Sequence, residues 1–205
     1  MKALASYWEL TEQLLGQKLP QSIAESLIVR YTEQHRAYHT VHHLQDCFHQ
    51  FERIKDQCDH ADEVALALWF HDAIYDTRKH DNEEKSADLA VETLIKQKIL
   101  PAKIERIRKM IVATKHQSPA ADKDTGALLD IDIHVLGAEP ARYAHYETQI
   151  REEYCWVPDA LYKQGRKKIL RHFLDQPRIY HTPLFFQERE TQARQNLKNA
   201  ISVLN

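Results

Sequence analysis

The run VALALWF, residues Val64–Phe70, decides the fold because it is apolar on every side. A helix without a polar face has to be buried, so this run predicts a central helix enclosed by other elements. The residues that follow it directly, His71 and Asp72, carry side chains that bind metals, and an extended polar stretch starts at Asp72. We therefore expect the central helix to end here and to present both side chains at its C-terminal end.

The rest of the chain has the periodicity of amphipathic helices. Four glycines occur in 205 residues, and apolar side chains recur every three or four positions over long stretches. Asp81 followed by Glu84 resembles a capping box for a helix that reaches Leu94 and Ile99. Residues 118–125 are expected to form a polar loop, and residues 128–136 a short apolar helix. With no internal repeat or linker, the sequence predicts an all-α fold, a compact helical bundle in one domain over residues 1–205.

Composition excludes several classes of function. The net charge of −2 gives no electrostatic footprint for nucleic acid or for a membrane surface. The three cysteines show no CxxC spacing, and their odd number fits a reducing compartment. Neither a signal peptide nor an apolar run long enough for a membrane span is visible. We expect a cytoplasmic protein without nucleic-acid or membrane partners, and the sequence does not decide between a monomer and a homodimer.

Histidines are the unusual feature of the composition, with 13 in the chain and four of them within His35–His43. Residues four apart share one face of a helix, so His39 and His43 are expected to point into one pocket. The adjacent His71 and Asp72 can converge on one ion where a helix ends or deforms. Imidazole with carboxylate suits zinc, manganese, iron or nickel, and a site with few such ligands leaves room for a water that the metal acidifies.

Two acids, Asp130 and Asp132, lie inside the apolar stretch 128–136. Buried acids are costly unless they are paired or bind a metal. A structural ion pair or a helix cap would explain either of them, and each histidine taken singly could lie on the surface. A metal site explains the whole set at once, with either Asp130 or Asp132 as its distal ligand.

The order of these motifs resembles the HD-domain metal-dependent phosphohydrolases. A bacterial group of predicted HD phosphohydrolases is the closer resemblance, and its motifs cover most of the chain. The resemblance implies a helical domain of HD type that hydrolyses phosphoesters with a divalent metal. The segments that carry it are Arg36–Leu44 (RAYHTVHHL), Trp69–Asp76 (WFHDAIYD), Asp81–Ala87 (DNEEKSA), Ala113–His116 (ATKH), Asp130–Asp132 with Leu136–Gly137, and Ala193–Leu197 (ARQNL).

The resemblance also implies a role for each motif residue. Tyr38-His39 with His43 is similar to a motif of cyclic nucleotide phosphodiesterases, in which the first histidine protonates the leaving oxygen and the second binds metal. It implies His39 as general acid and His43, His71 and Asp72 as ligands, with Asp72 able to bridge two ions. HD proteins with an Asp-x-Asp run usually coordinate through the second acid, which favours Asp132. Thr40 stands where those enzymes have Asn, so cyclic nucleotide cleavage is not implied.

Weaker candidates surround this set. Asp76 and Glu83 could hold a metal-bound water or a second ion, with first-turn helix acids as the alternative. His116 could bind phosphate, or it could lie in solvent at a helix end. Three cationic side chains could likewise bind phosphate or simply lie in solvent: Arg36, Lys115 and Arg166. The candidate catalytic residues are therefore His39, Asp76, Glu83 and His116.

The function expected from the sequence is a metal-dependent phosphohydrolase. Its substrate would be a small phosphoester, such as a nucleotide or another phosphorylated metabolite, attacked by a metal-activated water. The metal would be manganese, iron, nickel, cobalt, zinc or magnesium, bound as one ion or two. Two other functions fit the same ligands, a di-iron oxygenase of HD type and a non-catalytic regulatory module that binds metal or nucleotide.

Overall fold

The computed structural model describes residues 2–204, so the ends of the expected domain, residues 1 and 205, lie outside the described part. The all-α class is confirmed, because the described residues form helices and no strand. The helices are α1 (Lys2–Leu15), α2 (Gln21–Arg30), α3 (Val41–Ile54), η1 (Lys55–Gln57), α4 (Ala61–Phe70), α5 (Asn82–Lys96), α6 (Pro101–Ala113), α7 (Lys123–Asp132), η2 (Ile133–Gly137), α8 (Pro140–Glu153), α9 (Asp159–Leu174) and α10 (Pro183–Val203). None of the helices within residues 2–204 has both the length and the apolar character needed to cross a membrane.

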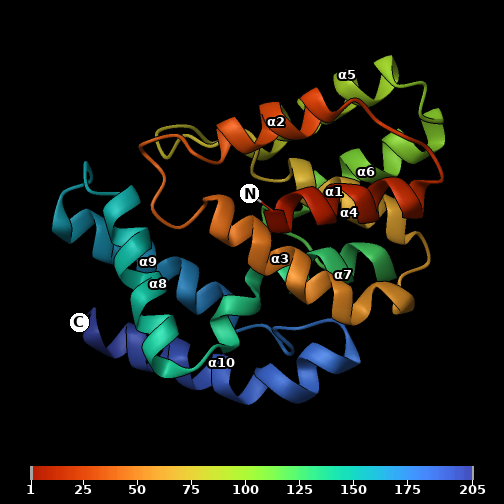
Figure 1. Ribbon diagram of the computed structural model, residues 1–205. Coiled ribbons are helices and arrows are strands. Elements are labelled where there is room, and N and C mark those ends of the chain that lie inside the picture. Colours follow the sequence, from red (N-terminus) through yellow and green to blue (C-terminus); the bar gives the residue numbers. More distant parts are fainter. Residues whose placement is uncertain (1, 205) are drawn as a thin grey trace.

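Helix α4 is the buried centre that the apolar run predicts. It packs against α1, α2, α3, α5, α6 and α7, which surround it in Figure 1. Every residue from Val64 to Phe70 is buried. The polar residue that enters this interior, Glu63, is paired with Arg106 through two contacts of 2.6 and 2.7 Å, which offsets the cost of burying its charge.

A second group of helices lies to one side of this centre. In Figure 1, α8, α9 and α10 lie apart from α1 and α4, with α10 against η2 and α9. Gly137 ends η2 where a side chain has no room, since a Cβ there would lie 2.5 Å from Cβ of Arg189. This close approach lets α10 pack directly on η2.

Two expected elements differ from the structure. The capping box is wrong: Asp81 precedes α5, but its carboxylate makes no capping hydrogen bond. Lysines attract both acids instead, Asp81 being 2.9 Å from Lys85 and Glu84 2.6 Å from Lys115. Helix α5 ends at Lys96, so Ile99 lies in the turn that leads to α6.

The single helix expected over residues 128–136 is also wrong. Helix α7 starts earlier, because the carboxylate of Asp122 accepts a hydrogen bond from the backbone N–H of Thr125 and caps the helix. The α-helix then stops at Asp132, and the 3₁₀-helix η2 continues to Gly137. Asp132 therefore lies at a change of helix type, facing the ends of α3 and α4.

Candidate metal centre

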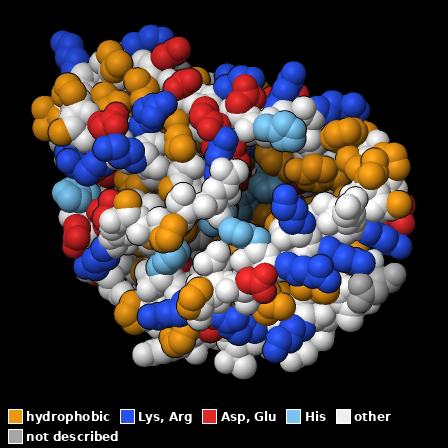
Figure 2. Space-filling view, turned by 180° about the vertical axis from the view of Figure 1, so that it is seen from behind, with side chains coloured by type: hydrophobic (Ala, Val, Ile, Leu, Met, Phe, Trp, Pro, Cys, Tyr) orange, Lys and Arg blue, Asp and Glu red, His pale blue; other side chains and the backbone are white. Residues whose placement is uncertain are grey.

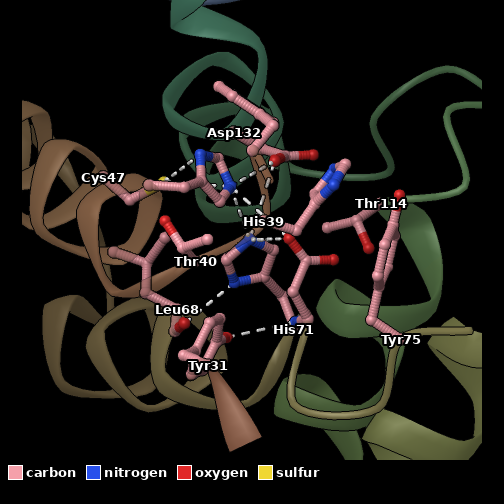
Figure 3. Close-up of polar contacts among 12 residues, drawn as sticks. Tyr31, His39, Thr40, Cys47, Leu68, His71, Tyr75, Thr114 and Asp132 are labelled. Atoms are coloured by element: carbon pink, nitrogen blue, oxygen red, sulfur yellow. Dashed lines mark hydrogen bonds and ion pairs between the residues drawn. The ribbon is translucent and has the colours of Figure 1, made fainter. Parts of the chain in front are cut away.

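Three helix ends meet behind a cleft and bring four metal-binding side chains together. His43 comes from the first turn of α3, His71 and Asp72 follow α4, and Asp132 ends α7. Their ligand atoms all lie within 4.8 Å of one another. Figure 3 shows His71, Asp132 and the neighbouring polar side chains converging from separate ribbons. Both histidines are 1% exposed, so they form the floor of the site and not its mouth.

The end of α4 explains how two adjacent residues reach one point. His71 is the C-terminal cap of α4, and the chain leaves the helix directly after it. Nδ1 of His71 lies 2.8 Å from the carbonyl oxygen of Leu68 (Figure 3). A carbonyl only accepts, so Nδ1 carries a proton and Nε2 is the ring nitrogen that faces the cluster. Arg36 fixes the turn, donating to the carbonyl oxygens of His39 and Asp72 at 3.0 and 2.8 Å.

The histidine pair is arranged differently from the sequence-based expectation. Thr40 caps α3, its side chain accepting from the N–H of His42, so His39 lies outside the helix. Sharing a helical face with His43 therefore does not orient His39. The rings of His39 and His43 nevertheless lie close together, with centroids 5.7 Å apart, because other contacts hold the turn before α3 in place.

Asp132 and Asp130 face different partners. Residues two apart on an α-helix point about 200° apart, so both cannot serve one site. Asp130 binds the backbone N–H groups of His181 and Thr182, each at 2.7 Å, and anchors the segment before α10. Asp132 directs Oδ1 at the two histidines, while Oδ2 lies 2.9 Å from Nε2 of His116. Of the two acids, Asp132 is therefore the one that lies in the cluster, and His116 orients it.

The distances within the cluster match the spacing of ligands around one ion. Nε2 of His43 lies 3.2 Å from Nε2 of His71, and 3.4 Å from an oxygen of Asp72 and from one of Asp132. Nε2 of His71 lies 3.1 and 3.6 Å from the same two oxygens. Ligands about 2.1 Å from a tetrahedral ion are about 3.4 Å apart, and neighbouring ligands of an octahedral ion about 3.0 Å.

The electrostatics of the cluster also fit a cation. Burial opposes the charged form of His71, yet the carboxylate of Asp72 holds the pKa of His71 well above its usual value. Burial would likewise raise the pKa of Asp132, but hydrogen bonds from His116 and the two cluster histidines hold it well below its usual value. Oδ2 of Asp72 is buried without a hydrogen-bond partner. Two carboxylates, one of them with an oxygen that lacks a hydrogen bond, and two imidazole rings at one buried point are the donor set of a divalent transition metal.

A second set of contacts holds His39 beside this centre. Oε1 of Glu153 accepts three backbone hydrogen bonds, from the N–H groups of residues 37, 38 and 39, at 2.8–2.9 Å. Its other oxygen lies 2.7 Å from Nδ1 of His39 and accepts from the hydroxyl of Tyr75, also at 2.7 Å. Because a carboxylate accepts, Nδ1 carries a proton and Nε2 of His39 is left to exchange one with the cleft.

The cleft in front of the cluster has a volume of about 400 Å³. Its polar end is lined by His39, Asp72, Glu83, His116 and Asp132. The remainder is apolar and aromatic, including Leu136, Leu161, Ile169, Leu170, Tyr162 and Phe173. Figure 2 shows a hollow on this face with histidine side chains inside it and hydrophobic side chains along one side.

The weaker candidates lie in different places. Glu83 and His116 line the cleft, whereas Asp76 does not line it. Oδ1 of Asp76 instead accepts from the backbone N–H of Arg78 and shapes the turn before α5. Burial raises the pKa of Glu83. The three candidate phosphate-binding cations are engaged elsewhere: Arg36 by backbone carbonyls, Lys115 by Glu84 and Arg166 by Glu147.

Glu153 is the residue that sequence reasoning missed. It is 4% exposed and shares the buried face of α8 with Tyr143, Tyr146 and Ile150. The helical spacing of the apolar residues places Glu153 on the same buried face, so the sequence could have indicated a buried acid here. The sequence also did not predict that Cys47 borders the cluster; its sulfur lies 3.6 Å from Nε2 of His43.

The ionised carboxylate of Glu153 should stabilise the fold in a pH-dependent way. Although burial opposes ionisation, His39, Tyr75 and the backbone N–H groups lower the pKa of Glu153 from 4.5 to about 2. A lowered folded-state pKa gives stability above about pH 4.5 that is lost as the pH falls toward 2, on the order of 3 kcal/mol. The difference in unfolding free energy between wild type and Glu153→Gln should therefore be largest near neutral pH and shrink below about pH 4.5.

Urea unfolding at a series of pH values measures this difference. Glu152→Gln, which changes an exposed neighbour on the same helix, is the matched control and should show a much smaller effect. A Glu153→Gln difference that stays constant from pH 7 to pH 3 would contradict this account of the carboxylate.

The centre thus combines a cluster that could hold a metal ion, a histidine oriented by Glu153 and an adjoining cleft. Such an arrangement can hold an anionic ligand against a metal and deliver a proton to it. Comparison with known proteins adds no family to this geometry, since no family model, no curated protein and no solved structure matches the chain.

Proposed function

We propose that this protein is a metal-dependent phosphohydrolase of HD type that acts on a small phosphoester, a nucleotide or another phosphorylated metabolite. One observation carries the proposal: the cluster of His43, His71, Asp72 and Asp132 opens on a cleft in which His39 is held by Glu153. A metal site alone would need no oriented histidine beside it. The pairing of the two is what hydrolysis of an ester requires.

The metal would be held by the four cluster residues. A divalent ion there supplies Lewis acidity toward a phosphoryl oxygen and lowers the pKa of water. Two imidazole nitrogens favour manganese, iron, cobalt, nickel or zinc over magnesium, which prefers oxygen ligands. His116 keeps Asp132 oriented, so that one carboxylate oxygen stays directed at the histidines.

The chain's own residues provide the proton transfer. Glu153 fixes the ring of His39 and its tautomer, and Tyr75, whose ring centroid lies 4.2 Å from that of His39, restricts its rotation. Nε2 of His39 then donates a proton to the leaving oxygen of an ester that lies in the cleft. Glu83 lines the same end of the cleft, and its proposed role is to hold a water.

The substrate and location follow the same reasoning. A cleft of about 400 Å³ suits a small molecule, and the proposal includes no nucleic acid and no membrane. The three cysteines are free thiols, which supports a reducing compartment, and we place the enzyme in the cytoplasm.

The proposal is tested with protein that is stripped of metal and then supplied with manganese, cobalt, nickel or magnesium. Activity should require added transition metal and appear on small phosphomonoesters or nucleoside monophosphates. Asp72→Asn, purified identically, should be inactive and controls for contaminating phosphatase. Efficient cleavage of DNA or RNA, or full activity in excess chelator, would overturn the proposal. Metal binding without turnover of any ester would favour a non-catalytic regulatory module. Two bound irons together with a requirement for oxygen would favour a di-iron oxygenase.

A further inference from the structure

The cleft beside the metal cluster has a second, apolar end. Beyond His39 and Asp132 it is walled by side chains of η2, α8 and α9, such as Leu136, Ile150 and Ile169. Two apolar residues of this wall are unusually open to solvent: Leu161 is 59% exposed and Ile169 is 48% exposed. Figure 2 shows hydrophobic side chains beside the hollow, on the side where α9 lies. Apolar surface of this kind next to a reactive centre gains free energy when a ligand covers it.

Two polar side chains that line the cleft are already hydrogen-bonded to backbone groups. The side-chain amide of Asn82 bonds the backbone of Asp76 through both of its ends. The hydroxyl of Thr114 donates to the carbonyl oxygen of Ile111. A ligand with many hydroxyl or amide groups would lose its bonds to water here without regaining them, which is unfavourable.

A buried hydroxyl in the wall of the cleft lacks a hydrogen-bond partner among the residues that the structure describes. The hydroxyl of Tyr38 is buried and makes no hydrogen bond within the described residues, and Tyr38 lines the cleft. Its ring is fixed between His43 and Tyr146, with centroid distances of 4.8 and 4.6 Å. The hydroxyl can serve a single ligand oxygen close to the metal cluster.

Charge limits the number of phosphate groups. Among the described residues that line the cleft, Arg166 supplies the one lysine or arginine side chain, and Glu147 neutralises it through contacts of 2.8 and 3.0 Å. Asp72, Glu83 and Asp132 add three carboxyl groups to the same lining. One phosphate can be neutralised at the metal, whereas a second would meet acids and no unpaired lysine or arginine among the described lining residues.

We propose that the cleft is built for a monophosphate ester of an apolar alcohol, with the phosphate at the metal cluster and the hydrocarbon or aromatic group against α8 and α9. This inference rests on the proposed function and narrows its substrate class. It places sugar phosphates, nucleotides and polyphosphates among the poorer ligands of the site.

The test compares esters with similar leaving alcohols on metal-loaded protein. Hexyl phosphate should have a kcat/KM at least about tenfold above glycerol 1-phosphate and ribose 5-phosphate. Ile169→Gln should lower kcat/KM for hexyl phosphate by roughly threefold to tenfold and lower it much less for glycerol 1-phosphate, so that the preference between the two esters shrinks. Val29→Gln is the matched control, because Val29 is 67% exposed on α2 and does not line the cleft.

Binding separates this inference from the proposed function. By calorimetry, hexylphosphonate should bind the metal-loaded protein about tenfold more tightly than 2-hydroxyethylphosphonate. If hexylphosphonate binds more tightly but no ester is turned over, the inferred apolar ligand class stands and the proposed hydrolase function is wrong. If polar and apolar esters are hydrolysed equally well, the proposed hydrolase function stands and the inferred apolar ligand class is wrong. Failure to bind either phosphonate would overturn the ligand class.

Discussion

Replacing His71 with alanine is expected to abolish stoichiometric binding of a divalent transition metal. Nε2 of His71 lies 3.1–3.6 Å from ligand atoms of His43, Asp72 and Asp132, so its removal opens one side of the coordination shell. Losing an orienting residue around a metal typically costs 10–100-fold in affinity, and loss of a ligand itself should cost more than about 100-fold. Metal content of the purified protein and competition with a chelator measure the effect.

Two controls accompany this variant. His42→Ala removes an exposed histidine next to His43 on the same helix and should bind metal as wild type does. Asp72→Asn changes a ligand without leaving a cavity, so loss of metal there cannot be ascribed to misfolding of α4. If His71→Ala keeps the affinity of wild type, the cluster is not the metal site.

Replacing His39 with alanine should have the opposite profile, with turnover lost and metal retained. His39 is positioned by Glu153 and lies beside the cluster, which is the geometry of a proton donor. Loss of a general acid reduces turnover by about 100- to 10,000-fold. Steady-state kinetics on the best phosphoester, with metal content measured on the same preparation, give the result.

His35→Ala is the matched control for His39, because it alters a half-exposed histidine in the same segment between α2 and α3. Its turnover should stay within a few-fold of wild type. Loss of metal from His39→Ala would instead make His39 a ligand, and the proton donor would have to be sought elsewhere in the cleft.

The fold was largely predictable because its centre is encoded locally. The run Val64–Phe70 has no polar face, so burial was the one outcome open to it, and the helix end at His71 followed from the polar residues after it. Capping was harder to predict. Asp81 and Glu84 satisfy the spacing of a capping box, but Lys85 and Lys115 compete for the same carboxylates. The second of these lysines is distant in sequence, so local pattern could not reveal it.

The candidate site was predictable in its residue types and less so in its supports. The approach of His39 to His43 was expected from helical spacing, whereas Thr40 caps α3 and Glu153, 114 positions away, holds His39. Asp130 and Asp132 were equivalent by spacing, and the change of helix type after Asp132 distinguishes them. The contacts that hold His39 to Glu153 and Asp130 to the segment before α10 both join distant parts of the chain.

Anomalous diffraction at the absorption edge of a metal bound to the purified protein tests the central claim most directly. The account predicts one strong peak about 2.0–2.3 Å from Nε2 of His43, Nε2 of His71 and carboxylate oxygens of Asp72 and Asp132. Nε2 of His39 should lie nearby without coordinating. A peak ligated by other residues, or no peak in crystals of protein saturated with metal, would contradict it.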